Sequence, residues 1–182
     1  MNETLKTIQT RYSCRSFNDV PIEKEKVDAI ALSGVQSPSG LNLQPWKIIV
    51  LQNKEMIDEM DKTLMNKLAS LEDTSIYERM MNRGGNVFYN APCMFIVAKV
   101  PGKDLDCGIV VENMALAASS LDLGNVICGM AAMVINDECG AAYKEKLIPE
   151  GYEFGIALLV GYPVNPEGTP HEPDMSKIIY VE

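Results

Sequence analysis

The sequence has a single histidine, His171, and none of its five cysteines forms a Cys-x-x-Cys pair. A Cys–His or Ser–His nucleophile would depend on that one histidine. The spacing of the cysteines suits neither a disulfide framework nor a thiolate zinc site. His171-Glu172 opens like a zinc-protease motif, but Pro173 breaks the required helix and Met175 replaces the second histidine. We expect free, buried cysteines and no metal site.

Basic residues are also scarce, with 16 Lys and Arg against 25 Asp and Glu and a net charge of -9. Nucleic acids and anionic membranes bind proteins through a surplus of basic residues, so neither is an expected partner. No apolar run approaches the roughly 20 residues that a membrane span requires, and residues 1–4 lack the features of a signal peptide. These absences lead us to expect a cytoplasmic protein.

Two common nucleotide-binding fingerprints are missing as well. No Gly-x-Gly-x-x-Gly sequence occurs in the chain, which argues against a Rossmann domain. The spacing of Gly124 and Gly129 resembles the ends of a P-loop, but Met130 stands where that loop needs a lysine. Nucleoside triphosphate binding is therefore not expected.

Hydrophobic patterning predicts one domain, residues 1–182, of mixed helix and strand. We expect helices over 3–9, 23–32, 54–71, 104–123 and 137–147. We expect strands over 46–51, 94–100 and 154–160, and another at the start of 124–134. Gly34 is the expected stop of the second helix and Asn136 the cap of the last. Residues 37–45 read as a loop, and 72–86 are ambiguous. The proline-rich tail, 164–182, is expected to lie extended over the surface or over a partner.

The predicted helix 104–123 is apolar around most of its circumference. A helix of this kind is expected to be buried on nearly all sides, which is easier to achieve with a second subunit in so small a chain. We therefore expect a homodimer with this helix near its interface. The alternative is a central helix in a monomeric α/β sandwich.

Four segments carry possible binding chemistry, and the last of them is the tail, Gly161-Tyr162-Pro163 and then His171. Arg11, Ser13 and Arg15 alternate, so an extended chain would point them the same way and form a compact site for a phosphate. Asn42 and Gln44 offer donors and acceptors that suit the imide edge of a heterocycle. Gly129 would let a flat ligand approach the backbone closely. Exposed arginines and an ordinary loop are the simpler readings of the first two segments.

Taken in order along the chain, the motifs resemble those of the nitroreductase family. The resemblance covers essentially the whole chain, and its motifs are Arg11-x-Ser13-x-Arg15-x-Phe17, Ser37-Pro38-Ser39-x-x-Asn42-x-Gln44-Pro45-Trp46, Ala91-Pro92, Asp106 with Glu112-Asn113-Met114, Leu121-x-Leu123-Gly124 and Gly161-Tyr162-Pro163. It implies an α+β fold with a central, mainly antiparallel sheet flanked by helices. It also implies an intertwined homodimer with two FMN sites at its interface.

The resemblance also implies roles for particular residues. Arg11, Ser13 and Arg15 would hold the FMN phosphate and ribityl chain, and the backbone N–H of Gly129 would donate to flavin N5. The implied cofactor-binding residues are Arg11, Tyr12, Ser13, Arg15, Pro38, Ser39, Gly40, Asn42, Gln44, Cys128, Gly129 and His171, with the loop residues 38–44 coming partly from the opposite subunit. His171 stands about where many relatives carry a phosphate-binding basic residue, so the tail's role is in doubt.

The resemblance implies an FMN-dependent oxidoreductase. A nicotinamide cofactor, NADH or NADPH, would reduce the flavin, and a small oxidised acceptor of the nitroaromatic, quinone or enone type would then take the electrons in a ping-pong scheme. The alternatives are an FMN-binding redox sensor or carrier without turnover, and a flavin dehydrogenase acting on another substrate. The sequence does not identify the acceptor, the preferred nicotinamide cofactor or the role of 72–86.

Overall fold

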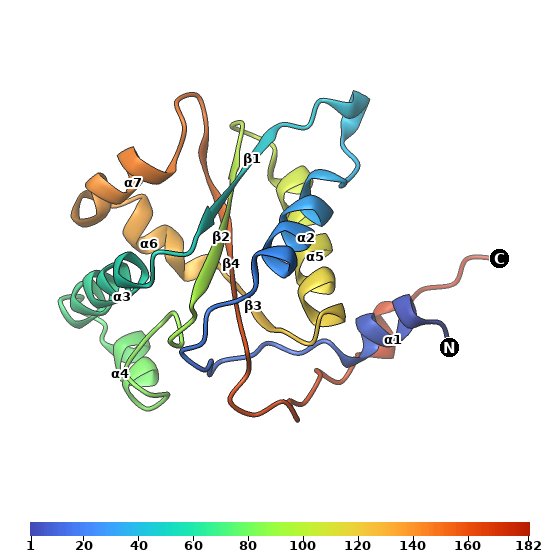
Figure 1. Ribbon diagram of the computed structural model, residues 1–182, viewed down its shortest axis with the longest axis horizontal. Coiled ribbons are helices and arrows are strands. Elements are labelled where there is room, and N and C mark those ends of the chain that lie inside the picture. The colour runs from blue at the N-terminus through green and yellow to red at the C-terminus, as the bar shows by residue number, and fades with distance from the viewer.

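A four-stranded antiparallel sheet forms the centre of the computed structural model, which describes residues 1–182 (Figure 1). Its strands lie in the order β1-β2-β4-β3, with β1 at Trp46–Leu51, β2 at Cys93–Lys99, β4 at Glu153–Gly161 and β3 at Gly124–Cys128. Every pairing in the sheet is antiparallel. The predicted α+β fold is confirmed, and β1 has the predicted bounds.

The two inner strands are buried on both faces. All seven residues of β2 are buried, and their side chains alternate between two apolar clusters. Met94 and Ile96 point into one cluster, whereas Phe95 and Val97 point into the other. A strand covered by helices on both sides reads as a continuous apolar run, which is how residues 93–98 appear in the sequence.

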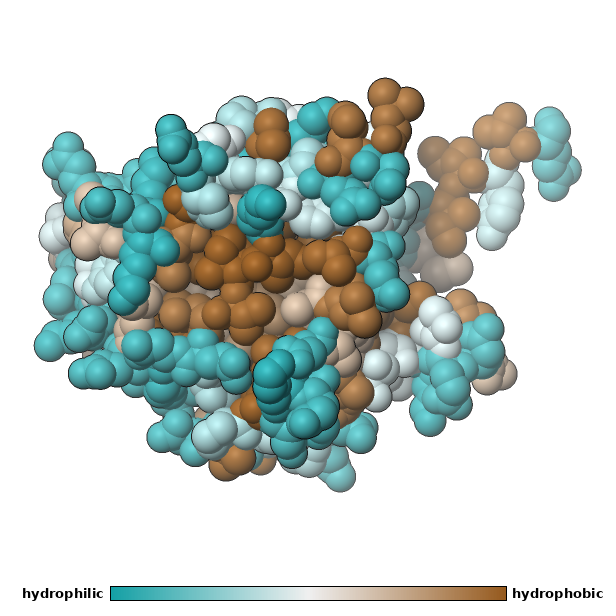
Figure 2. All heavy atoms as spheres, turned by 45° about the horizontal axis from the view of Figure 1, so that its top comes forward, coloured by the Kyte–Doolittle hydropathy of each residue, from teal (hydrophilic) through white to brown (hydrophobic).

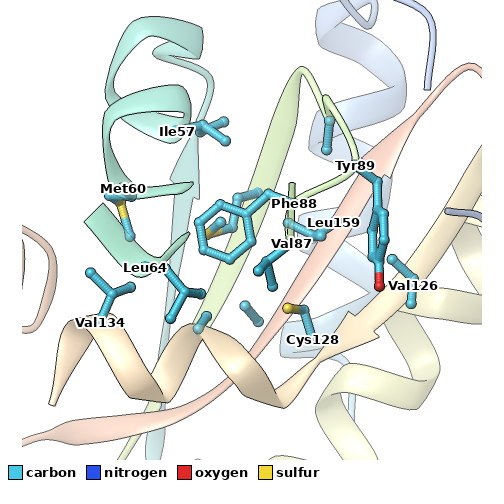
Figure 3. Close-up of a cluster of buried hydrophobic side chains, with 14 of the residues drawn as sticks. Ile57, Met60, Leu64, Val87, Phe88, Tyr89, Val126, Cys128, Val134 and Leu159 are labelled. Carbon is cyan, nitrogen blue, oxygen red and sulfur yellow. The ribbon is translucent and has the colours of Figure 1, made fainter. Parts of the chain in front are cut away.

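Helices cover both faces of the sheet (Figure 1). On one face lie α2, Lys24–Val35, and α5, Asp104–Ser120. On the other lie α3, Lys54–Ala69, α6, Ala132–Ile135, and α7, Ala141–Leu147. Figure 3 shows the core under α3, where Phe88 packs beside Leu64 and Met60. No helix is both long enough and apolar enough to cross a membrane.

Three sequence-based assignments are corrected. Helix α2 continues through Gly34, because α2 packs so closely there that a Cβ would lie 2.6 Å from Ile48 Cδ1 and 2.8 Å from Met114 Sδ. Asn136 ends α6 and does not cap α7; Asp137 instead caps a short 3-10 turn, Glu138–Gly140, and α7 begins at Ala141. The ambiguous stretch 72–86 contains helix α4, Ser75–Met81.

Helix α5 is buried on one side only within the single chain. Val110, Met114 and Ala118 face the sheet and are fully buried. Leu105 is 80% exposed and Leu116 is only partly covered, although both are apolar. The predicted burial on nearly all sides is therefore not achieved by one chain.

The two ends of the chain lie outside this body, on the same side of the molecule (Figure 1). Helix α1, Glu3–Thr10, has no buried residue. The tail from Val164 onward has a single 3-10 turn, Met175–Lys177, and is exposed over residues 171–182. Tyr12 anchors its first part by donating a hydrogen bond to the Asn165 carbonyl at 3.0 Å.

Candidate functional site

A cavity of about 270 Å³ lies beside the end of β3. Four segments line it: the stretch after α1, helix α4, the approach to β2, and the end of β3 with the turn that follows. Its apolar wall includes Val87, Val126, Ile127 and Met130. Its polar groups include the guanidinium of Arg15. A mostly apolar cavity with a few polar groups is the usual form of a small-molecule site.

The position of Arg15 follows from how the chain crosses the sheet edge. Ser13 forms a parallel bridge with Asn125 of β3, and the Cys14 N–H donates to the Asn125 carbonyl at 2.9 Å. The crossing requires glycine at 124, because a Cβ there would lie 2.8 Å from Cys14 Sγ. Cys14 is buried at this crossing, and Arg15 emerges exposed on the far side, at the cavity.

Gly129 forms an open part of the cavity wall. It follows the last residue of β3 and begins a 3-10 turn, Gly129–Ala131. The nearest atom to a Cβ built on it is Ile156 Cδ1 at 3.7 Å, an ordinary van der Waals distance. The position is exposed, so the absence of a side chain leaves backbone accessible to a flat ligand.

Cys128 contributes an apolar surface and not a reactive thiol. Its side chain is buried among the core residues and lies next to Val87 (Figure 3). Burial raises the pKa of the Cys128 thiol to about 11. The thiolate is the reactive form of cysteine, so this residue is unreactive near neutral pH.

A second cavity, of about 220 Å³, contains Arg11 and Tyr12 together with Asn125 and Pro163. Arg11 Nε lies 3.9 Å from Glu112 Oε1 on α5. The Tyr12 ring lies against the tail, where a Cβ on Gly168 would be 2.0 Å from the ring. Asn125 Oδ1 is buried here without a hydrogen-bond partner, while its Nδ2 donates to the Ala115 carbonyl and to Ser119 Oγ.

The two arginines of the first motif therefore line different cavities in the single chain, whereas their alternation along the sequence predicts that they point the same way. The backbone between them is pinned to β3 at Ser13, with Arg11 held toward α5 by Glu112 and Arg15 on the side of α4. Whether a ligand phosphate draws them together stays a prediction.

The loop over residues 37–45 is anchored at one end and exposed in its middle. Asn113 Nδ2 donates to Ser37 Oγ at 3.0 Å. Leu41, Asn42 and Gln44 have positive φ angles of 53°, 55° and 46°. Such left-handed conformations of non-glycine residues store strain, which is found most often at functional sites. Within the loop, Ser39 Oγ accepts from the Gln44 N–H at 2.9 Å.

This loop lies far from the first motif within one chain. The loop leads into Trp46, which is level with Glu153 of β4, whereas the segment 11–15 crosses the sheet at Asn125, which is level with Val160. Glu153 and Val160 are seven residues apart, about 23 Å at roughly 3.3 Å per residue. β1 and β3 also lie at opposite edges of the sheet, about 14 Å apart at the usual strand spacing. Pro38, Ser39, Gly40, Asn42 and Gln44 line neither cavity.

His171 lies in the exposed tail and lines neither cavity. Two further arginines, Arg79 and Arg83, also line the cavity beside Gly129, and no motif of the sequence analysis includes them. Arg79 lies in α4, but Arg83 lies two residues beyond the last helical residue, Met81, so helical spacing does not predict that both face one cavity.

Known proteins share this fold. The model of the nitroreductase family matches residues 8–162. A crystal structure of a nitroreductase with bound FMN from Desulfitobacterium hafniense DCB-2 has 43% identity, a TM-score of 0.95 and full coverage of both chains. A nitroreductase with bound FMN from Bacteroides fragilis has 26% identity, a TM-score of 0.87 and full coverage of both.

A curated relative, the NADPH-flavin oxidoreductase of Vibrio harveyi, is 28% identical over 178 residues, which is 95% of this chain and 71% of that protein. The match of the family model over most of the chain agrees with the sheet order, the helices on both faces and the crossing of segment 11–17 over β3. The chain therefore belongs to the nitroreductase family.

Proposed function

We propose that this protein is an FMN-dependent oxidoreductase that passes electrons from NAD(P)H to a small oxidised acceptor. The observation that carries the proposal is the cavity at the end of β3, which combines Arg15, an apolar wall and the open backbone at Gly129. FMN combines a phosphate, which guanidinium groups bind well, with a flat and largely apolar ring. The residues present fit that group.

When bound, FMN supplies the redox chemistry by accepting a hydride from NAD(P)H and returning two electrons to the acceptor. The residues of this chain would bind the cofactor and orient it. Arg11, Ser13 and Arg15 would hold the phosphate and the ribityl chain, and Gly129 would let the ring lie against the backbone. No carboxylate or histidine lines the cavity beside Gly129, so these walls offer no acid–base side chain of that kind. We expect the acceptor to be a nitroaromatic, quinone or enone.

We further infer that two copies of the chain complete each site. The loop over 38–44 is too far from Arg15 to line the same cavity within one chain, and its strained, exposed residues fit a role toward a partner. On one face of helix α5, Leu105 is exposed and Ile109 and Leu116 are only partly covered. Figure 2 shows a broad apolar area framed by polar side chains on one face of the molecule, and large exposed apolar patches mark interaction surfaces.

The cysteines support a reducing compartment for this reaction. All five are free thiols, and four of them are buried. Proteins of oxidising compartments use disulfides far more often, so we infer a cytoplasmic setting.

The first experiment asks whether the protein is a flavoenzyme. The full chain is purified with added FMN and gel-filtered, and its absorbance near 450 nm is followed under argon as NADH or NADPH is added. We expect a retained yellow colour, bleaching by one or both dinucleotides, and recovery of the colour when a nitroaromatic or a quinone is added. Retained FMN without bleaching would indicate a binding module, and a protein that does not retain FMN would contradict the proposal.

A further inference from the structure

Arginine is concentrated at one cavity. The chain has four arginines, and three of them, Arg15, Arg79 and Arg83, line the cavity beside Gly129. No Asp or Glu lines it, although acidic residues outnumber basic ones in the chain. The eight ion pairs of the structure involve other cations, so none of these three guanidiniums has a carboxylate partner.

Helix α4, which carries Arg79 and ends just before Arg83, is fixed by apolar contacts on its other side. Met80 is buried in the core and Ile76 packs partly against it. Arg79 is exposed at the cavity, and Arg83 follows the helix end in a turn where its N–H donates to the Met80 carbonyl at 2.9 Å. The approach to β2 is held as well, because Asp61 Oδ1 accepts from the Val87 and Phe88 N–H groups, each at 2.8 Å.

Three unpaired like charges at one cavity repel one another and attract an oxyanion. In the proposed site, the FMN phosphate already has Arg11, Ser13 and Arg15 as partners, so the two arginines of the α4 segment are available to a second anion. Their planar forks match a carboxylate or a phosphate. The apolar wall provides a surface for a ring beside that anion.

We propose that Arg79 and Arg83 bind an oxyanion on the small molecule that exchanges electrons with the cofactor, so that the enzyme prefers anionic over neutral ligands. The inference rests on the proposed function and names its ligand class. Two sources have the same chemistry: a carboxylate on an aromatic acceptor, and the 2′-phosphate of NADPH.

Equilibrium binding to the oxidised, FMN-loaded protein tests this without turnover. Benzoate and its neutral analogue benzamide probe the acceptor, and 2′,5′-ADP and 5′-AMP probe the dinucleotide; dissociation constants come from calorimetry. The variant is Arg79→Gln/Arg83→Gln. The matched control is Lys144→Gln/Lys146→Gln, which removes the same charge from α7, where neither lysine is in an ion pair or lines the cavity.

We expect the arginine variant to bind benzoate or 2′,5′-ADP roughly tenfold or more weakly, the size typical of lost charge-assisted hydrogen bonds. The dissociation constant of the neutral or less charged analogue of that pair should change by less than about twofold. The same should hold for the dissociation constants of all four ligands with the lysine control. A selective loss for benzoate identifies the acceptor as the source, and one for 2′,5′-ADP identifies NADPH.

The proposal is overturned if neither pair shows a selective loss, or if both members of a pair weaken equally. It is also overturned if the arginine variant loses FMN itself, since the two side chains would then serve the cofactor. If the wild type retains FMN and is bleached by NAD(P)H, but benzoate and 2′,5′-ADP bind the wild type and the arginine variant equally well, only this inference fails. Should the wild type not retain FMN, the proposed function fails, and the same titrations on the FMN-free protein still test the arginines.

Discussion

The inner strands and the peripheral segments of this molecule use apolar residues in opposite ways. Every residue of β2 is buried. In the loop over 37–45, by contrast, Leu41 is 94% exposed, and in the tail Ile179 and Val181 are 85% and 91% exposed. One chain completes its own core, yet it leaves uncovered the segments that the nitroreductase resemblance assigns to the cofactor. This difference supports the proposal that one chain is sufficient for the fold, whereas two chains are needed to complete the cofactor site.

The largest expected effect is a weaker homodimer after substitution of the apolar residues at the end of the tail. Burying one such side chain is worth about 1.5–3 kcal/mol, so replacing Ile178, Ile179, Tyr180 and Val181 by serine should weaken a homodimer by roughly a hundredfold or more. The thermal stability of the body should change little, because these residues are exposed in the single chain. Sedimentation equilibrium measures the dimer constant.

The matched control for the tail is Glu172→Gln/Asp174→Asn, which alters exposed polar residues of the same segment. It should leave the dimer constant within about threefold, since exposed charges contribute little. An unchanged dimer constant in the serine variant would show that the tail does not bind a partner.

Substitutions at two glycines should distinguish an effect on the stability of the fold from an effect on FMN binding. A Cβ on Gly155 would lie 2.7 Å from the Val97 carbonyl oxygen and 2.4 Å from Cys107 Sγ, so Gly155→Ala should cost about 1–3 kcal/mol of stability and lower the melting temperature by several degrees. Gly129→Ala has room for its methyl group and should melt like the wild type, but it should weaken FMN binding roughly tenfold by crowding the ring. Calorimetric melting and fluorescence titration with FMN measure the two effects. Wild-type FMN affinity in Gly129→Ala would mean that the ring lies elsewhere.

Arg11 lies where the N-terminal segment meets α5, and its loss should affect the cofactor more than the fold. Arg11→Ala should weaken FMN binding roughly tenfold or more, because a charge-assisted hydrogen bond is typically worth about 1.5–3 kcal/mol. Glu112→Gln, which removes the carboxylate 3.9 Å from Arg11 Nε, should leave the affinity unchanged or raise it up to about fivefold. Riboflavin lacks the phosphate and should bind all three proteins alike. Equal FMN affinity in Arg11→Ala and the wild type would show that Arg11 does not bind the FMN phosphate.

The smallest expected effect concerns an ion pair on the surface of the body. The pKa of Asp137 is lowered to about 2 by the ammonium group of Lys67 and by hydrogen bonding with Cys139. The unfolded chain has the ordinary aspartate pKa near 3.9, so the folded state binds fewer protons between these values. The stabilisation is therefore present above about pH 4 and is lost as the pH falls toward 2.

Urea unfolding of the wild type and Asp137→Asn at several pH values measures this effect. The stability difference between the two should shrink as the pH falls from about 4 toward 2, and it should also shrink with added salt. A difference that is the same at pH 7 and pH 2.5 would contradict the pairing. FMN binding near neutral pH should be identical in both proteins.

The sequence predicts the body of this fold better than its periphery. The apolar runs of β2 and β4 are long enough to predict both strands within a residue at each end, because burial on both faces leaves a continuous apolar signal. Gly34 was misread as a stop, since its role is to let α2 approach Met114 from elsewhere in the chain. The sequence does not identify helix α4, because seven residues are too few for its core-facing pair, Ile76 and Met80, to establish a helical period.

The site is predictable from sequence only as a set of motifs. Arg15 and Gly129 meet at one cavity because the bridge between Ser13 and Asn125 places them together, and that pairing has no local signal. Alternation along an extended chain suggested that Arg11 would join them, but its contact with Glu112 of α5 holds it at another cavity.

Sedimentation velocity of the FMN-loaded protein, followed at 450 nm and at 280 nm, tests the shared site most directly. The flavin absorbance should sediment as a single species of about twice the chain mass of 20.1 kDa, and on dilution the flavin should be released as that species dissociates. Flavin that sediments with a stable particle of one chain mass would contradict the account, because a single chain would then hold the cofactor without its partner's loop.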